Sequence, residues 1–261
     1  MSLQDVVYKL DPVLWVHDLN LLPYDKDGNP GRLDPWQQAL LRDREHGYII
    51  LNIHRQAGKS QLASIMGVHQ ATFFPPALVL LLSPTLRQSG ELQRKCLRLY
   101  NLIDPDHNGL QEDTKLSIQL TNGSRIIALP GHEDNIRGYS APDLIIEDES
   151  SRVSDDLYTA IRPMLATNPR GRLVSLSTPN GKVGHFYRIW TEGGAEWLKI
   201  KRTADQCPRI SPEFLQNERL NMTESMFLQE YYGEFQEAEG AVFSSDLFKS
   251  LANPSVSALK L

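Results

Sequence analysis

Short, mostly apolar runs recur along this chain, several of them unbroken by any polar residue, and this feature constrains the fold more than any other. The runs lie at 48–53, 78–83, 116–120, 125–129, 144–147 and 173–177. Strands that are buried on both faces have this composition, and mostly parallel sheets bury both faces. Helical stretches lie around them at 34–46, 59–71, 86–102, 154–166 and 183–192. The alternation predicts an α/β fold with a mostly parallel central sheet flanked by helices.

The two ends of the chain depart from this rhythm. Three prolines and two glycines in the first 31 residues predict a loop-rich segment that ends in turns. Ser211-Pro212 and Thr223 mark the starts of two later helices, near 212–220 and 224–233. We therefore expect an N-terminal arm at 1–32, a core at 33–205, a small helical lid at 206–235 and a linker at 236–261.

Composition narrows the class of protein. Lys and Arg number 27 and Asp and Glu number 32, so the net charge of −5 disfavours a protein that coats itself with nucleic acid through a wholly basic surface. The two cysteines, Cys96 and Cys207, provide neither a disulfide framework nor a metal-ligand spacing. No run approaches the ~20 apolar residues that span a bilayer, and the N-terminus lacks the regions of a signal peptide. We expect an intracellular protein without a membrane segment.

The segment from Tyr48 to Ser60 has the pattern of a phosphate-binding loop. An apolar strand leads into Arg55-Gln-Ala-Gly-Lys-Ser60 and then into a helix. Gly58 would let the backbone approach phosphates, Lys59 would reach the β- and γ-phosphates, and the hydroxyl of Ser60 would bind Mg²⁺. The consensus requires a glycine where this chain has Ile53. On this segment alone, an ordinary strand, turn and helix with an incidental Gly-Lys-Ser stays open.

A second segment, Asp143-Leu-Ile-Ile-Glu-Asp-Glu149, is predicted to be a buried strand that ends in acids. A nucleotide hydrolase needs one carboxylate to hold Mg²⁺ and another to activate the attacking water. We assign Asp148 to the metal and Glu149 to the general base. Glu147 leaves this register ambiguous by one residue, because the three preceding positions are all apolar. Alone, the segment could also be an acidic strand end exposed to solvent.

Two further residues have both a functional and a structural interpretation. Thr178, in the strand end Ser177-Thr-Pro-Asn-Gly181, could lie beside the γ-phosphate and transmit its loss, and an ordinary tight turn explains the segment equally well. Gln37, three residues after Asp34, could complete a helix capping box or could bond the adenine edge through its amide. Both pairs of alternatives stay open here.

The whole pattern, from about residue 33 to 235, resembles the ATPase domain of the large terminase subunit, the motor that packs DNA into tailed-phage capsids. That family has a deviant Walker A loop with an arginine inside it and no first glycine, as at 55–60 in this chain. Four other segments match in the correct order: 33–37 resembles its adenine-contacting segment, 144–149 its Walker B strand, 177–181 its coupling motif and 227–235 the end of its ATPase region.

The resemblance implies a P-loop NTPase of the ASCE type that binds ATP and Mg²⁺. Arg55 would approach the γ-phosphate within the same subunit, and Arg137, in Ile136-Arg-Gly138, would be offered to the ATP of a neighbouring subunit. A solvated loop arginine remains the alternative for Arg137. The implied catalytic residues are Lys59, Arg55, Arg137 and Glu149, and the implied metal ligands are Ser60 and Asp148. The implied nucleotide-binding residues are Gln37, Arg55, Gln56, Ala57, Gly58, Lys59, Ser60, Gln61 and Thr178.

The resemblance also implies partners: double-stranded DNA, the portal protein and the small terminase subunit, in a homo-oligomeric ring on the procapsid in the host cytoplasm, with a monomer as the alternative for the isolated chain. The basic residues of helix 86–102 could face DNA, and a solvated helix face explains them equally well. The family's nuclease domain is built on clustered carboxylates. We find no such cluster in the 26 residues after Phe235, so we expect ATPase activity without nuclease activity in this chain.

Three other classes of protein remain as alternatives. The first is a fragment of a helicase or related translocase, which would need a second domain of similar size. The second is a DNA-binding scaffold that kept the fold and lost turnover. The third is a metal nuclease that uses Glu147, Asp148 and Glu149, and consecutive strand residues alternate faces, which opposes their convergence on one metal ion.

Overall fold

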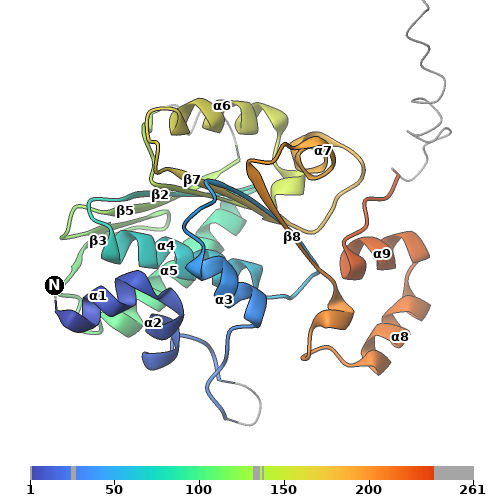
Figure 1. Ribbon diagram of the computed structural model, residues 1–261, viewed down its shortest axis with the longest axis horizontal. Helices are drawn as coiled ribbons and strands as arrows, with labels where there is room; N and C mark the ends of the chain where they lie inside the picture. Colours follow the sequence, from blue (N-terminus) through green and yellow to red (C-terminus); the bar gives the residue numbers. More distant parts are fainter. Residues whose placement is uncertain (1, 25–27, 132–135, 137, 238–261) are drawn as a thin grey trace, which may run out of the picture.

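The computed structural model describes residues 2–24, 28–131, 136 and 138–237. Within them, eight strands form one sheet (Figure 1), in the order β3-β4-β5-β2-β6-β7-β1-β8. The strands are β1 (Tyr48–Ile53), β2 (Leu78–Ser83), β3 (Leu110–Asp113), β4 (Ser117–Leu120), β5 (Arg125–Pro130), β6 (Leu144–Asp148), β7 (Arg172–Ser177) and β8 (Trp197–Arg202). The six strands from β5 to β8 in this order run parallel, and β4 and β3 extend the sheet antiparallel. The predicted mostly parallel α/β sheet is confirmed.

Strand β7 lies between β1 and β6 and pairs with both. Asn52 near the end of β1 is opposite Ser177, and Asp148 at the end of β6 is opposite Leu176. Because all three strands are parallel, their carboxyl ends lie together along the same end of the sheet. The loop that follows β1, the acids that follow β6 and the turn that follows β7 are therefore neighbours.

Helices cover both faces of the sheet (Figure 1). On one side are α3 (Pro35–Arg42), α4 (Lys59–Phe73) and α5 (Leu86–Ile103), and on the other are α6 (Asp155–Leu165) and α7 (Gly184–Glu192). Alternate residues of β1 enter the two cores: Ile49 and Leu51 pack with α4, and Ile50 packs with α6 and α7. This double burial is the physical reason for the unbroken apolar runs.

The loop-rich segment predicted at 1–32 is wrong for residues 3–18, which form two helices, while the described residues between 19 and 32 contain no helix or strand. Helix α1 (Leu3–Leu10) begins at a capping box of Ser2 and Asp5, and α2 (Pro12–Asp18) begins at the N-cap Asp11. Trp15 is buried and its ring lies 5.4 Å from that of His69 on α4, so the segment belongs to the core. Serine and aspartate N-caps with proline at the first turn are helix signals that the count of prolines obscured.

Strands β3 and β8 were also absent from the predicted set. Both lie at edges of the sheet, where one side of the strand is solvated and polar residues are tolerated. Their sequences, Leu-Gln-Glu-Asp and Trp-Leu-Lys-Ile-Lys-Arg, therefore lack the apolar run that identified the central strands.

The two helices expected near 212–220 and 224–233 are present as α8 (Pro212–Asn221) and α9 (Glu224–Tyr232). They follow β8 and pack on a small cluster of their own, made by Ala204, Leu215 and Phe227. Figure 1 shows the pair beyond β8, separate from the main helical layers. None of the helices in the described part of the chain is long and apolar enough to cross a membrane.

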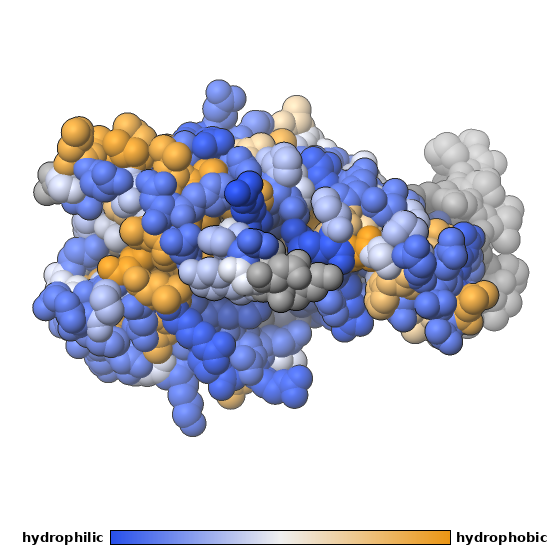
Figure 2. All heavy atoms as spheres, turned by 90° about the horizontal axis from the view of Figure 1, so that it is seen from below, coloured by the Kyte–Doolittle hydropathy of each residue, from blue (hydrophilic) through white to orange (hydrophobic). Residues whose placement is uncertain are grey.

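Figure 2 shows the face that carries α1, α2 and α3, and polar side chains dominate it. Apolar side chains gather toward the side where Figure 1 places α1 and α2. Leu3, Leu10 and Leu14 on these helices are among the exposed large apolar residues.

Candidate active site

The loop between β1 and α4 has a backbone suited to binding an anion. Gly58, the N-cap residue of α4, has φ 81° and ψ 20°, and Gln56 also has a positive φ of 61°. The first N–H groups of α4 have no carbonyl partner within the helix, so they are available to phosphate oxygens. Ile53, which stands where the consensus has glycine, is a fully buried core residue at the end of β1. The left-handed backbone lies later in this loop, at 56 and 58.

Lys59 begins α4, and its side chain folds back under the loop. Its Nζ donates to the carbonyl oxygens of Ile53 (3.1 Å) and His54 (3.0 Å), and only 7% of the residue is exposed. Burial lowers the pKa of Lys59, while the carboxylates of Glu149 and Asp148 oppose that shift. The ammonium therefore lies in a low-dielectric position between the loop and the acids, where its charge acts strongly on an anion.

Ser60 and Asp148 join the loop to the acid strand. The Oγ of Ser60 donates to Oδ2 of Asp148 at 3.2 Å. Burial and the neighbouring Glu149 carboxylate raise the pKa of Asp148 to about 6, and Lys59 and Ser60 oppose this shift. A hydroxyl and a carboxylate are oxygen ligands of the kind that Mg²⁺ prefers, and this ion is usually held by few protein groups together with substrate phosphates. The pair fits Mg²⁺, and the described residues contain no larger cluster of His, Cys, Asp and Glu that could hold a metal.

The three consecutive acids do not share one side of the sheet. Asp148 points toward the loop, and Glu147 points to the opposite face, where it is fully buried. Glu149 leaves the strand with φ 54° and ψ 41°, a left-handed conformation that is uncommon for a residue with a side chain. This turn brings its Oε2 to 3.4 Å from Oγ of Ser177 and 3.4 Å from Nη1 of Arg152. Asp148 and Glu149 are therefore the two acids beside Lys59.

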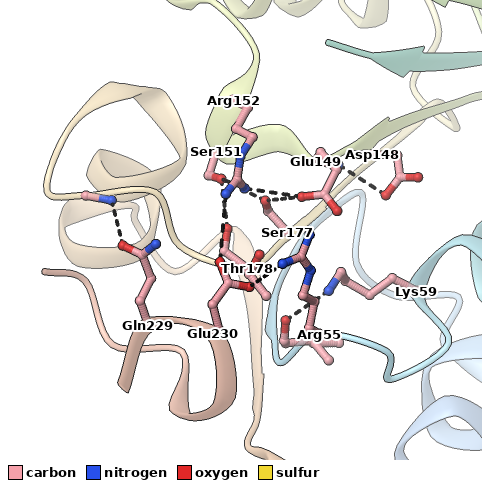
Figure 3. A network of polar contacts seen from close by, with 12 residues as sticks. Arg55, Lys59, Asp148, Glu149, Ser151, Arg152, Ser177, Thr178, Gln229 and Glu230 are labelled. Atoms are coloured by element: carbon pink, nitrogen blue, oxygen red, sulfur yellow. Dashed lines mark hydrogen bonds and ion pairs between the residues drawn. The ribbon is translucent and has the colours of Figure 1, made fainter. Parts of the chain in front are cut away.

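Arg55 lies on the rim of the site, with 73% of its side chain exposed. Its Nη1 is 3.7 Å from Oε2 of Glu230 on α9, and its backbone N–H donates to the carbonyl of Glu230 at 3.1 Å. Arg152 also approaches Glu230, with 4.0 Å between Nη2 and Oε1. Figure 3 shows Arg55, Arg152, Glu149 and Glu230 directed toward one another. A chain of alternating charges thus connects the acid turn, the loop and α9.

Sequence reasoning did not assign a role to Arg152 or Glu230. Arg152 follows Glu149 by three residues in the 3-10 helix Ser150–Arg152, and this spacing was its only local signal. Glu230 lies in the segment 227–235, whose resemblance to the family pointed to the region and not to this side chain.

The end of α9 is attached to the strand ends of the site. The Nδ2 of Asn52 on β1 donates to the carbonyl of Gly233 at 2.8 Å, and Oε1 of Gln229 accepts from the backbone of Gly181 at 3.4 Å. Gly233 has φ 64°, and a Cβ there would lie 2.6 Å from Oδ1 of Asn52. A side chain at this position would be strained and would displace that of Asn52, so glycine suits this contact.

Thr178 is buried beside the acid turn. Its carbonyl accepts from Oγ of Ser151 at 2.8 Å, and Ser151 also contacts Oγ of Ser177 at 2.8 Å. The end of β7 and the residues that follow Glu149 are thus directly hydrogen-bonded (Figure 3).

Gln37 participates in the capping box that was one of its two interpretations. Its Oε1 accepts from the N–H of Asp34 at 2.8 Å. Its Nε2 donates to the carbonyl of Ala57 at 3.3 Å, so the same buried side chain also contacts the loop. Beside it lies an open cleft of about 870 Å³, whose lining includes Leu22, Gln37, Gln56, Gln61, Leu62, Ile65 and Arg209.

The remaining predicted residues divide into those near the loop and one without a structural account. Ala57 is buried within the loop, Gln56 is exposed, and Gln61 is half-buried in the first turn of α4. Arg137 lies outside the described residues. The structure brings the other predicted site residues together at or beside the loop.

Comparison with known proteins identifies relatives of this chain. Residues 50–250 match the family described as the N-terminal part of the T4-like-virus-type terminase large subunit. The chain is 28% identical over 217 residues to the large terminase subunit of Escherichia phage T5, covering 78% of this chain and 48% of that protein. The chain spans about half the length of the curated relatives it matches.

Solved structures share its fold. The large terminase ATPase domain of Thermus phage P74-26 superposes with a TM-score of 0.69 at 20% identity, covering 78% of this chain and 94% of that one. The large terminase of a thermophilic bacteriophage in complex with ADP has a TM-score of 0.56 at 13% identity, covering 73% of this chain and 49% of that one. The chain therefore has the P-loop NTPase fold of these domains.

Proposed function

Because the chain belongs to the family of T4-like-virus-type terminase large subunits, in its N-terminal part, we propose that it is an ATP-hydrolysing motor domain that translocates double-stranded DNA into a viral procapsid. One observation carries the proposal: Ser60 from the loop contacts Asp148 from the acid strand, directly beside the buried Lys59. A phosphate-binding loop, a metal-ligand pair and a second acid thus meet at one edge of the sheet.

The residues of this chain suit binding of the triphosphate. Lys59 and the first N–H groups of α4 would hold the β- and γ-phosphates, with Gln56, Ala57, Gly58 and Gln61 around them. Ser60 and Asp148 would hold Mg²⁺, which supplies positive charge against the phosphates when bound. The cleft beside Gln37 is partly apolar and continuous with the loop, so we place the adenine there. The thermophilic-phage terminase solved with ADP supports a nucleotide in this fold.

Hydrolysis then requires a base and a group that neutralises charge. Glu149 would orient a water molecule and accept its proton while the water oxygen attacks the γ-phosphorus. The bond to the bridging oxygen breaks, and ADP and phosphate leave. Arg55 belongs to the loop itself, and its side chain would neutralise charge on the γ-phosphate after leaving Glu230. Thr178 and α9 would transmit the change, because Thr178 is hydrogen-bonded to Ser151 after the acid turn and the end of α9 is hydrogen-bonded to Asn52 on β1.

Calorimetry with ATPγS and Mg²⁺ tests the proposal on the full chain. We expect heat of binding that depends on Mg²⁺ and that is lost in the presence of excess ADP. Absence of any heat from adenine nucleotides would contradict nucleotide binding and would favour a scaffold that kept the fold alone. The metal-nuclease alternative has less support, since the side chain of Glu147 points away from Asp148 and Glu149.

The family resemblance also supports a role for Arg137 across a subunit boundary. In a DNA-bound assembly, we expect Arg137→Ala to slow ATP turnover at least tenfold, because the γ-phosphate of the neighbouring subunit loses a positive charge. Steady-state phosphate release from that assembly measures the effect. Arg170→Ala, an exposed arginine at the other end of the sheet, is the control. Turnover at the wild-type rate would show that Arg137 is an ordinary loop arginine.

The partners and location follow from the same proposal. We propose that the domain acts as a homo-oligomeric ring docked on the procapsid through the portal protein, with the small terminase subunit, in the host cytoplasm. Arg87, Arg94 and Arg98 are exposed on α5 and form a candidate DNA surface. Salt-dependent DNA binding that weakens when these arginines are replaced would support this surface.

A further inference from the structure

Behind the acid turn, Glu147 is held in a buried polar network that the proposed chemistry does not use. Its Oε2 accepts from Oγ of Ser150 at 2.6 Å and from Oγ of Ser175 at 2.8 Å. All three side chains are fully buried. A carboxylate without exposed surface is costly unless it is paired and hydrogen-bonded, so this network maintains the position of Glu147.

His185 on α7 completes the network from the opposite side. Its Nε2 lies 3.0 Å from Oε1 of Glu147, an electrostatic contact, and 3.1 Å from Oγ of Ser150. Its Nδ1 lies 3.3 Å from Oδ1 of Asp155, which also accepts the backbone N–H of His185 at 2.7 Å. The ring stacks on that of Tyr158, with 4.5 Å between the ring centres. Both ring nitrogens thus face carboxylate oxygens, which suits a doubly protonated imidazolium.

The network lies directly behind the strained backbone of the acid turn. Glu149 has φ 54°, a left-handed conformation that is unfavourable for a residue with a side chain. The residue two positions before it, Glu147, and the residue after it, Ser150, are joined through one carboxylate oxygen. The same oxygen joins both to Ser175 on β7. The hydrogen bonds of Glu147 therefore restrain the turn on the side opposite the loop. The carboxylate of Glu149 is directed toward Ser177 and Arg152.

We propose that Glu147, through Ser150, Ser175 and His185, is a positioning residue that holds the turn at Glu149 and aims its carboxylate at the attacking water. The inference rests on the proposed function, in which Glu149 is the base. A displacement of about 1 Å at a reacting group costs on the order of 100-fold in rate. The loosening of one hydrogen bond in this network should therefore appear in kcat.

Ser175→Ala tests the inference, since it removes one donor to Glu147 and touches no residue that faces the nucleotide. We expect kcat for ATP hydrolysis to fall about tenfold, with KM and the calorimetric affinity for ATPγS within about twofold of wild type. Ser175→Thr restores the hydroxyl and should restore most of kcat. The matched control is Ser89→Ala on α5, another fully buried serine, whose Oγ donates to the carbonyl of Leu129 at 2.8 Å.

Hydrogen exchange of the unliganded full chain separates this inference from the proposed function. In Ser175→Ala, and in His185→Gln if Ser175→Ala does not fold, we expect faster exchange at 149–153 than in wild type or Ser89→Ala. Wild-type kcat together with unchanged exchange in a folded variant would overturn the positioning role. A wild-type chain that hydrolyses no ATP would instead contradict the proposed function, and the exchange result would still decide the structural part.

Discussion

Replacement of Glu149 with glutamine is expected to lower the rate of ATP hydrolysis by about 10³-fold while ATP still binds, because positioned general bases contribute about 10²–10⁴-fold. The amide of glutamine keeps the size and one acceptor of the carboxylate, so the contacts with Ser177 and Arg152 can persist. What is lost is the ability to accept a proton from water. The position of Glu149 on a left-handed turn beside Lys59 is the structural reason for this assignment.

Single-turnover phosphate release and calorimetry with ATPγS measure the two quantities separately. Asp148→Asn provides the contrast, since it should weaken Mg²⁺-dependent binding as well as hydrolysis. Glu234→Gln is the control, because this exposed acid is paired with Lys201 and not with a residue of the acid turn. If Glu149→Gln lost ATP binding and Asp148→Asn lost only hydrolysis, the roles of the two acids would be exchanged.

Replacement of Lys59 with alanine is expected to abolish measurable ATP binding and hydrolysis. Hydrogen bonds to charged groups contribute about 1.5–3 kcal/mol each. Two such bonds from Nζ to the phosphates amount to about 3–6 kcal/mol, which corresponds to roughly 10²–10⁴-fold in affinity. Lys59 now donates to two backbone carbonyls, so its side chain already reaches across the loop where the phosphates would lie.

The same substitution should not destabilise the fold to a comparable extent. Burial lowers the pKa of Lys59 below its value in the unfolded chain. At every pH below the folded-state pKa, the charged ammonium therefore makes the free energy of unfolding smaller than a neutral amine would. Lys199→Ala is the matched control, since its half-buried Nζ also donates to a backbone carbonyl, that of Trp190, at 2.9 Å. Thermal unfolding and calorimetry distinguish the two variants. Lys59→Ala that binds ATPγS as tightly as Lys199→Ala would contradict the assignment.

The central strands and the loop could be predicted because their signals are local. Strand β1 was predicted at its observed bounds, since a strand buried on both faces must be apolar throughout. Gly58, Lys59 and Ser60 were recognisable because an anion-binding loop needs a small residue and a helix start at adjacent positions. The edge strands β3 and β8 were missed because solvent on one side permits polar residues.

The candidate site was predicted only in part, because its geometry depends on which face each side chain takes. The apolar residues before Glu147 could not tell which of the three acids faces the loop, and the kink at Glu149 follows no simple alternation. Arg55 and Arg152 both approach Glu230, and these three residues come from elements that are far apart in the chain, so no local pattern connects them.

The amino-acid sequence by itself determined the α/β class, the order of the central elements and the position of the candidate phosphate-binding loop, because apolar periodicity, helix caps and turn residues act over a few neighbouring residues. Only the tertiary structure decided that the side chain of Glu147 is buried in the core and that Gln37 caps α3 while it contacts the loop. It also decided that Glu230 of α9 pairs with Arg55. Those contacts arise where strand order brings distant segments to one edge of the sheet, and no local propensity encodes that juxtaposition.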